Sequence, residues 1–309
     1  MKFFARVPNI NFMAQRKTGL LVSTVLTLGA LLLVAIRGLN LGIDFTGGVL
    51  VEVEYPQTVE LDVVRADLAA AEYDRAVVQY FGSTNAVLIR LPPAANASSA
   101  QVSTNILQAL HAEEKGIELR RIEFVGPQVG EELTEKGGLA LLFAFIGIMI
   151  YIAFRFEWKF SIGAIAALIH DAVMVLGYLS LLWVEFDITT LAAILALIGY
   201  SNNETIVIFD RVRENLINQR RADILEVVNL SVNQTLLRSV ITHLTTLLVL
   251  FALLILGGSS VHSFSVALIF GVIVATYSSI YVSTNLAVAL GVSREDLLPP
   301  EDKEVDAMP

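Results

Sequence analysis

Six long apolar runs constrain the fold more than any other feature of this sequence. A helix that spans a bilayer needs roughly 20 mostly apolar residues. Runs of that kind cover residues 19–36, 138–154, 160–183, 188–209, 240–256 and 264–290. The chain is 55% hydrophobic and 17% charged, whereas soluble domains average about 45–50% and 25%. The sequence therefore predicts a membrane protein whose fold is an all-α bundle of six transmembrane helices.

Charge and composition exclude several classes of function. The net charge is −9, and a nucleic-acid partner would require clustered Lys and Arg. No cysteine is present, which removes disulfides, thiolate metal sites and thiol nucleophiles. The sequence contains no phosphate-binding loop, nucleophilic triad or metal motif. We therefore predict no nucleic-acid partner, no cofactor and no enzyme activity.

Basic residues in the short connections set the predicted orientation. They gather before the first run, at residues 155–159, at 211–221 and in the tail at 294–303, all on one side of the membrane. The opposite connections, 184–187 and 257–262, have no Lys or Arg. Because basic loops stay in the cytoplasm, both termini are predicted there. The first run is too long for a signal peptide and lacks a small-residue cleavage site, so we expect an uncleaved span.

A hydrophilic segment separates the first two spans on the outer side of the membrane. Strands are expected at residues 49–55, 77–81, 86–91 and 117–125, and helices at 59–73 and from the caps at 96–99 to 114. This β-α-β-β-α-β order is typical of a ferredoxin-like α/β domain. The predicted parts are thus 1–39 (N-terminus and first span), 40–136 (periplasmic domain), 137–291 (spans two to six) and 292–309 (acidic tail).

Ionisable residues inside the spans are candidates for function, because each costs several kcal/mol in a bilayer. They are His170, Asp171, Glu204, Arg238 and His243. Glu204 lies six residues before Asp210, where the cytoplasmic charges begin, and follows Asn202 and Asn203. Such a polar turn must face protein or water. A titrating Glu204 is favoured over a purely hydrogen-bonding one, while Asp171 is open to both interpretations.

The fifth span offers a basic partner for Glu204. Antiparallel packing of spans four and five would bring Arg238 to a similar depth, which favours an ion pair, although an Arg that snorkels to the interface is nearly as compatible with the sequence. Thr242 and Thr245 share the helical face of Arg238 and favour an inward polar stripe. His243 lies roughly 140° around the helix from Arg238. We therefore expect His243 to be a structural hydrogen-bonding residue rather than a proton carrier.

Several motifs resemble the SecD/SecF family of protein-export membrane proteins. They are LGIDFTGG at residues 41–48, HD at 170–171, IGYSNNETIVIFDRVRE at 198–214, and NQTLLR at 233–238, followed by TTL at 245–247 and GG at 257–258. The last two resemble the SecF branch in particular. In the first motif Gly42, Gly47 and Gly48 suit tight turns, and Asp44 can cap one of them. The resemblance extends over nearly the whole chain.

The resemblance implies half of an RND-type unit in the bacterial inner membrane. Its implied role is an auxiliary subunit of the Sec translocase, which uses the proton or sodium gradient to promote protein export. Implied partners are SecD, SecYEG, YajC, YidC, the unfolded polypeptide in transit and membrane lipid. By the same resemblance Glu204 stands at the family's membrane carboxylate, usually Asp, and Arg238 at its essential arginine.

Three departures from the family pattern bear on ion coupling. Glu204 replaces Asp, Asn202 replaces an apolar residue and His243 replaces a residue that is mostly Ser. These residues, with Asn203 and His170, are candidates for tuning the ion preference of the site. Two alternative functions remain: a non-transporting scaffold of the translocase, and an RND-type exporter of small molecules. The exporter is disfavoured because the single outer segment leaves little room for a substrate pocket.

Overall fold

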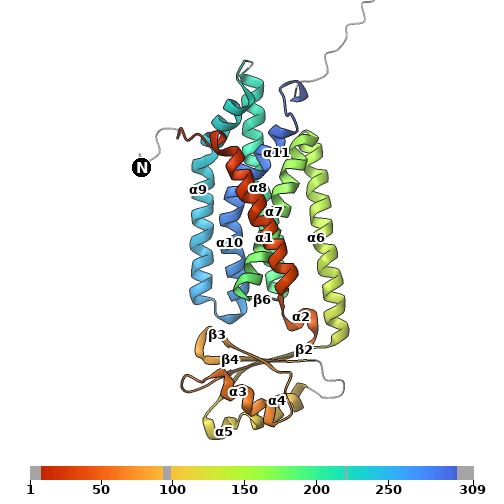
Figure 1. Cartoon of the computed structure of the whole chain (residues 1–309), viewed down its shortest axis with the longest axis vertical. Coiled ribbons are helices and arrows are strands. Elements are labelled where there is room, and N and C mark those ends of the chain that lie inside the picture. Colours follow the sequence, from red (N-terminus) through yellow and green to blue (C-terminus); the bar gives the residue numbers. More distant parts are fainter. Residues whose placement is uncertain (1–7, 93–98, 220, 298–309) are drawn as a thin grey trace, which may run out of the picture.

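The structure, a computed structural model, describes residues 8–92, 99–219 and 221–297 (Figure 1). Within them six helices are long and apolar enough to cross a membrane, which confirms the predicted membrane bundle. The helices are α1 (Arg16–Arg37), α6 (Pro127–Arg155), α7 (Trp158–Leu182), α8 (Ile188–Asn218), α9 (Ile224–Leu256) and α10 (His262–Ser278). A short 3₁₀ helix, η1 (Met13–Gln15), precedes α1, and a π-helical segment, η3 (Ser279–Ser283), continues α10 into α11 (Thr284–Ala289).

Helices α7, α8 and α10 form the centre of the bundle. Helix α10 packs against α7, α8 and α9, while α1 and α6 pack mainly on α7. Buried residues make up 56% of the apolar stretch of α10 but only 11% of those of α1 and α6. At Gly163 of α7 a Cβ atom would lie 2.6 Å from the carbonyl oxygen of Ser283, so a glycine allows this close helix approach.

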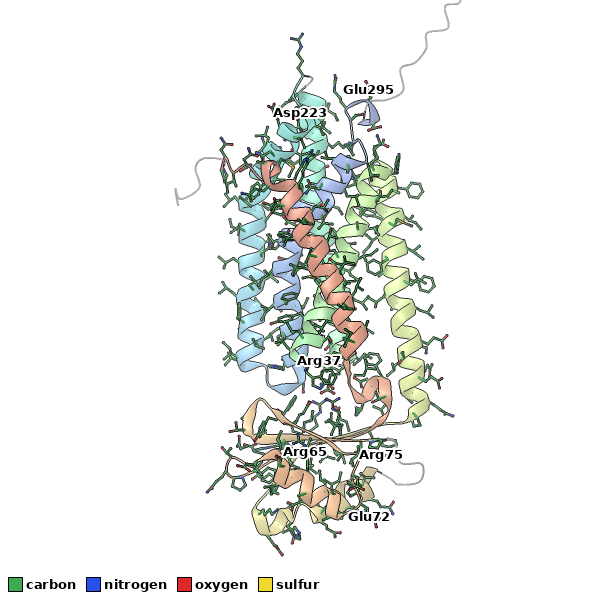
Figure 2. The ribbon with its side chains drawn as sticks, in the orientation of Figure 1. Arg37, Arg65, Glu72, Arg75, Asp223 and Glu295 are labelled. Atoms are coloured by element: carbon green, nitrogen blue, oxygen red, sulfur yellow. The ribbon has the colours of Figure 1, made fainter. Side chains whose placement is uncertain are left out.

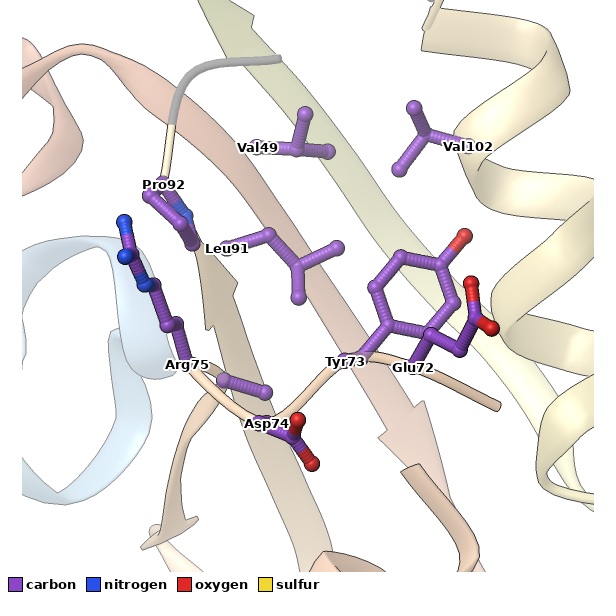
Figure 3. A pocket seen from close by; sticks show the side chains of 9 residues that line it. Val49, Glu72, Tyr73, Asp74, Arg75, Leu91, Pro92 and Val102 are labelled. Carbon is purple, nitrogen blue, oxygen red and sulfur yellow. The ribbon is translucent and has the colours of Figure 1, made fainter. Parts of the chain in front are cut away.

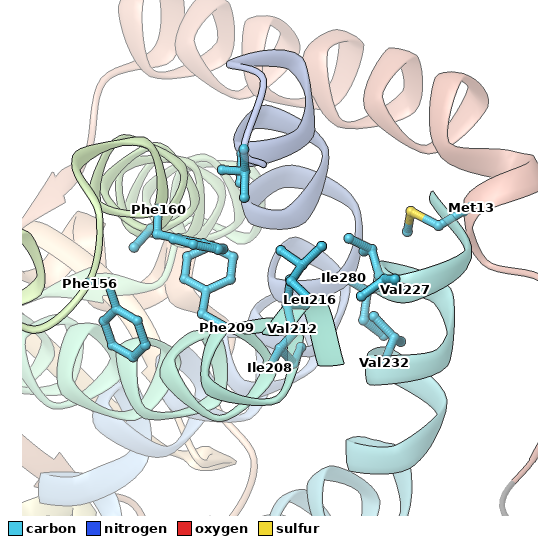
Figure 4. Packing of buried hydrophobic residues seen from close by; sticks show 14 of the residues in the cluster. Met13, Phe156, Phe160, Ile208, Phe209, Val212, Leu216, Val227, Val232 and Ile280 are labelled. Atoms are coloured by element: carbon cyan, nitrogen blue, oxygen red, sulfur yellow. The ribbon is translucent and has the colours of Figure 1, made fainter. Parts of the chain in front are cut away.

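An apolar cluster closes the bundle at the end away from the strands. Phe160 of α7 and Phe209 of α8 have ring centroids 4.7 Å apart, and Val212 and Ile280 pack beside them (Figure 4). Charged residues lie beyond the two ends of the bundle: Asp223 and Glu295 at one end, and Arg37 at the other, next to the α/β domain (Figure 2). The apolar length between them suits a bilayer.

The α/β domain lies between α1 and α6. Its antiparallel sheet has the order β3-β4-β2-β5, formed by β2 (Gly48–Glu54), β3 (Val77–Phe81), β4 (Ser83–Leu91) and β5 (Glu118–Val125). Helices α3 (Leu61–Ala70), α4 (Ser99–Ala109) and α5 (Ala112–Lys115) cover the face that points away from the bundle (Figure 1). The predicted β-α-β-β-α-β arrangement is thereby confirmed.

Some element bounds differ from the sequence prediction. The second helix does not run to Glu114, because His111 adopts a left-handed backbone with φ 54°, which cannot continue an α-helix, so α4 ends at Ala109 and α5 begins at Ala112. Helix α3 is shorter than the predicted 59–73, and β4 begins at Ser83 rather than at residue 86. The helix caps predicted at 96–98 and the acidic tail beyond residue 297 lie outside the described residues.

A cavity of about 300 Å³ opens at the edge of this domain (Figure 3). Val49, Leu91 and Val102 form its apolar side, and Glu72 and Arg75 belong to its polar border. Pro92, the last described residue before a gap, completes the lining. The cavity is far along the chain from the intramembrane charges and contributes nothing to their arrangement.

Candidate functional site

Glu204 lies where α8, α9 and α10 meet. Its side chain is 7% exposed in a turn of α8 that the sequence makes polar, and Oε1 accepts a short hydrogen bond from the Ser239 hydroxyl of α9. Its other oxygen, Oε2, lies 3.7 Å from Nε2 of His243, one turn further along α9. Nδ1 of His243 is 2.7 Å from the Thr276 hydroxyl of α10. One carboxylate is thus connected to side chains of two neighbouring helices.

Asp171 forms a second polar cluster across α7, α8 and α10. The residue is 1% exposed, and Oδ2 accepts hydrogen bonds from Ser201 of α8 at 2.6 Å and Ser278 of α10 at 2.8 Å. Oδ1 is 3.0 Å from Nδ1 of the adjacent His170. The other ring nitrogen of His170 is buried and has no hydrogen bond in the described part of the chain.

The two carboxylates differ in how fully they are hydrogen-bonded. Both oxygens of Asp171 are engaged, whereas Oε2 of Glu204 forms no hydrogen bond with any described residue. A carboxylate with every acceptor filled favours one fixed arrangement of helices. Glu204, with one oxygen free, can gain or lose a bonded partner without unfolding its surroundings.

The structure overturns the predicted inward stripe on α9. Arg238, Thr242 and Thr245 are exposed on the outside of the six-helix bundle, and no described acidic group lies within 4.0 Å of the Arg238 guanidinium. The predicted Glu204–Arg238 ion pair is therefore not formed in this structure. The face of α9 that points inward carries Ser239 and His243 instead, because α9 lies at the rim and packs on α8 and α10 through that face.

Of the two asparagines next to Glu204, one is partly buried in the bundle and the other is exposed on its outer surface. Asn202 is half-buried, and its Oδ1 has no hydrogen-bond partner among the described residues. Asn203 is exposed. Together with Arg238, it leaves polar groups on the outer surface of a membrane bundle, whereas the hydroxyls of Thr242 and Thr245 donate to carbonyls of their own helix. Lipid does not satisfy such groups, so this surface requires a protein or water neighbour.

Three hydroxyls of the site, Ser239, Thr276 and Ser278, were not among the residues predicted from the sequence. Thr276 and Ser278 belong to the last turn of α10, directly before the π-helical η3. Serines recur through this region, and the Ser283 hydroxyl donates to the carbonyl of Ser279 at 2.6 Å. Such π-helical turns are frequent at functional sites. The Ser and Thr residues clustered within an otherwise apolar run are the sequence feature that could have indicated these hydroxyls.

The segment containing the predicted signature residues joins the α/β domain to the start of α8. Strand β1 (Asn40–Leu41) pairs in parallel with β6 (Glu185–Phe186), and the short helix α2 (Ile43–Thr46) follows. Oδ2 of Asp44 accepts a hydrogen bond from the backbone N–H of Ile188 at 2.9 Å. Asp44 therefore satisfies an N–H in the first turn of α8, rather than capping its own turn. Gly42 lies against Glu185 and Asp187, where a side chain would collide.

Arg90 and Glu185 link the α/β domain to the segment that pairs β1 with β6, which we call the junction. Arg90 of β4 is 8% exposed, donates to the carbonyl of Leu41 at 2.9 Å and lies 3.7 Å from the Glu185 carboxylate. Arg121 of β5 reaches the hydroxyl of Ser260 between α9 and α10 at 3.2 Å. A cavity of about 210 Å³ separates the sheet from the bundle at this point. Sequence reasoning missed these contacts because they join segments far apart in the chain.

The junction is expected to depend on pH through Glu185. Burial raises the pKa of Glu185 above its ordinary 4.5, although Arg90 opposes the shift. A raised folded-state pKa means that the contribution to stability is complete below about pH 4.5 and is lost as the pH rises through the raised pKa. We expect hydrogen exchange at residues 40–41 and 185–186, corrected for intrinsic rates, to quicken over that range. Glu185→Gln should flatten this dependence, and an unchanged profile would remove Glu185 as its origin.

The described residues contain no cluster of three or more His, Asp or Glu side chains that could hold a metal ion. The chemistry available around Glu204 is therefore that of one carboxylate, one imidazole and two hydroxyls. A carboxylate beside an imidazole is chemically able to take up and release a proton or another small cation.

Comparisons with known proteins place this architecture in a family. A model described as "Protein export membrane protein SecD/SecF, C-terminal" matches residues 105–293, and one for the SecD/SecF GG motif matches residues 32–59. Protein translocase subunit SecF of Pseudomonas aeruginosa is 48% identical over 98% of this chain and 99% of its own length. The SecF of Vibrio alginolyticus is 43% identical over 97% of both chains.

Solved structures agree with the sequence comparisons. The crystal structure of SecDF from Thermus thermophilus is 40% identical, with a TM-score of 0.85 over 92% of this chain. A SecDF structure in a super-membrane-facing form is 39% identical, with a TM-score of 0.68 over the same share. This chain corresponds to 39% of each SecDF chain. With its six helices and its inserted α/β domain, the chain belongs to the SecD/SecF family as a relative of the translocase subunits named SecF.

Proposed function

We propose that this subunit uses the proton or sodium gradient to promote protein export, with Glu204 binding and releasing the ion. The observation that supports this most strongly is the Glu204 carboxylate, buried where three helices meet and hydrogen-bonded through one oxygen only. An ionisable group at this depth is costly to keep in a membrane protein, which makes it a candidate for function. The match to a family of protein-export membrane proteins supports protein export as the process that the ion drives.

The physical mechanism requires no covalent chemistry. Binding of a cation neutralises Glu204 and changes its attraction to the groups on α9, so the helices favour a second arrangement. One charge that crosses 100 mV supplies about 2.3 kcal/mol, enough to shift a two-state equilibrium about 50-fold. In this proposal the positive charge of Arg238 favours the ionised form of Glu204 once the cation has left. The two SecDF structures match this chain with TM-scores of 0.85 and 0.68, and the second is titled a super-membrane-facing form, which supports more than one conformation among SecDF proteins.

Helix α8 provides the connection from the ion site to the α/β domain. It begins at the Asp44–Ile188 contact and continues without interruption to Glu204, sixteen residues later and about 24 Å along the axis. A rigid helix transmits a displacement over that distance. Movement at Glu204 therefore acts directly on the segment that carries the α/β domain.

The outward polar surface of α8 and α9 supports SecD as the partner. Asn203, Arg238 and Thr242 are exposed there. In the SecDF structure the region that matches this chain makes up 39% of a longer single chain. In this proposal both termini are cytoplasmic, residues 40–136 lie in the periplasm of a bacterial inner membrane, and SecYEG, YajC, YidC, lipid and the exported polypeptide are further contacts.

The test is export of a reporter into membrane vesicles that contain this subunit, SecD and SecYEG, with proton and sodium gradients imposed separately. In wild type, one of the two gradients is expected to raise the export rate. In Glu204→Gln, export is expected to proceed at the rate seen without any gradient. Asp210→Asn is the matched control, since this carboxylate lies on the same helix but is 56% exposed. A full gradient response in Glu204→Gln, with normal assembly, would indicate a scaffold or an ion site elsewhere.

A further inference from the structure

His243 faces Glu204 without forming a hydrogen bond to it. The ring is 6% exposed, and its Nε2 points at Oε2 of Glu204 across 3.7 Å, beyond hydrogen-bonding distance. At 5.3 Å between centroids, the ring of Tyr200 packs beside it. The imidazole and the carboxylate are thus held close together in a buried place.

Thr276 determines which nitrogen of His243 carries the hydrogen. Its hydroxyl lies 3.0 Å from the carbonyl of Val272, which can only accept, and 2.7 Å from Nδ1 of His243. While Thr276 donates its one hydrogen to that carbonyl, Nδ1 must be the donor to Thr276. The neutral imidazole then presents the lone pair of Nε2 to Glu204.

Two acceptors therefore face each other when Glu204 is ionised. A carboxylate oxygen and an imidazole lone pair repel, and a single proton between them replaces the repulsion with a charge-assisted hydrogen bond. Such bonds are about 2.7–2.9 Å long, whereas the present separation is 3.7 Å. Proton binding would thus bring Nε2 of His243 and Oε2 of Glu204 about 1 Å closer together.

The same arrangement disfavours sodium. Hard cations require several oxygen ligands, and the atom opposite Oε2 is an imidazole nitrogen. The only described side-chain oxygen hydrogen-bonded to Glu204 is the Ser239 hydroxyl, which binds the other carboxylate oxygen. A cation placed between Oε2 and Nε2 would have one hard ligand, whereas a proton needs only the two atoms already present.

None of the remaining ionisable groups on the packed helices forms a hydrogen bond or an ion pair with Glu204 in the described part of the chain. On α7, Asp171 bonds to His170 through one oxygen and accepts from Ser201 and Ser278 through the other. On α10, Tyr277 donates to the carbonyl of Gly19 at 2.5 Å. Arg238 of α9 is exposed, and Tyr200 of α8 contacts the ring of His243. Among described residues, His243 is thus the ionisable group whose nitrogen faces Oε2.

We propose that Glu204 and His243 share the coupling proton, and that His243 makes this site selective for protons over sodium. The inference rests on the proposed ion coupling through Glu204 and adds the second atom that holds the ion. His243 is here a proton-binding residue, and Thr276 is a positioning residue that orients it.

The decisive experiment is an infrared titration of the purified, folded subunit in detergent. Glu204→Gln identifies the band of the protonated Glu204 carboxyl, and the pH midpoint of that band is then compared between wild type and His243→Gln. In His243→Gln the midpoint of the Glu204 band should lie about one pH unit lower than in wild type. This shift corresponds to an approximately tenfold weaker affinity of Glu204 for the proton. Thr276→Val should move the midpoint the same way, and Thr276→Ser, which keeps the hydroxyl, should restore it.

An equal midpoint in wild type and His243→Gln, with both proteins folded by circular dichroism, would overturn the shared proton. Gradient-driven export provides the second arm: His243→Gln should lose much of its preference for a proton over a sodium gradient, and an unchanged preference would overturn the selectivity. These outcomes are separable from the parent proposal. If Glu204→Gln keeps the gradient response, the coupling proposal fails, whatever the infrared midpoints show.

Discussion

Gly48→Ala is expected to destabilise the α/β domain by more than about 2 kcal/mol. Gly48 begins β2, which lies between β4 and β5, and has φ 126°, a backbone conformation that strongly favours glycine. An added Cβ would lie 2.2 Å from the carbonyl oxygen of Leu91 at the end of β4. Because that atom belongs to the backbone of the neighbouring strand, it cannot move aside without opening the sheet.

The measurement is limited proteolysis and thermal unfolding of the full chain in detergent. Gly126→Ala is the matched control, since it makes the same chemical change just after β5, at a position with negative φ and with nothing within 4 Å of the added atom. Cleavage in residues 48–125 should quicken for Gly48→Ala and stay near wild type for Gly126→Ala. Equal behaviour of the two variants would show that the β2–β4 contact tolerates a methyl group.

Gly48 thereby has a physical role beyond the one that its motif suggested. The sequence indicated that Gly48 serves a tight turn where the chain leaves the membrane. The structure places the constraint in the sheet itself, at the close approach of β2 to the end of β4. A backbone contact of that kind involves residues more than forty positions apart, and local sequence rules do not reach it.

The bundle and the order of the α/β elements were predictable, because hydropathy over twenty residues and alternation over five are local properties. The helix bounds were less accurate, since α8 and α9 continue beyond their apolar stretches into polar turns. The break at His111 depends on a left-handed residue that composition does not indicate.

The candidate site was likewise predictable in part, from local properties of the sequence, and in part only from the packing of the helices. Glu204 and Asp171 were identifiable from their cost in a bilayer, and both are buried. The orientation of α9 was not identifiable, because its apolar residues surround the whole helix and do not distinguish an inner face. Periodicity correctly separated His243 from Arg238, but only the packing against α8 and α10 shows that His243 is the inward one.

Asp171→Leu should destabilise the bundle by about 3–5 kcal/mol, more than Glu204→Gln should. The substitution removes the acceptor shared by Ser201 and Ser278 and strands the ring of His170, in a site where the carboxylate is 1% exposed. Asp171→Asn keeps one acceptor oxygen and should cost less, about 1–3 kcal/mol. Thermal unfolding in detergent measures both.

The two variants also separate a structural Asp171 from an ion-carrying one. If the carboxylate serves to tie α7, α8 and α10 together, Asp171→Asn should lower stability and yet retain a gradient response in the folded fraction. Glu204→Gln should do the reverse, because Glu204 has a single hydrogen bond to lose. A stable Asp171→Asn protein without any gradient response would instead assign the ion to Asp171 rather than Glu204, and the conformational response to the contacts among α7, α8 and α10.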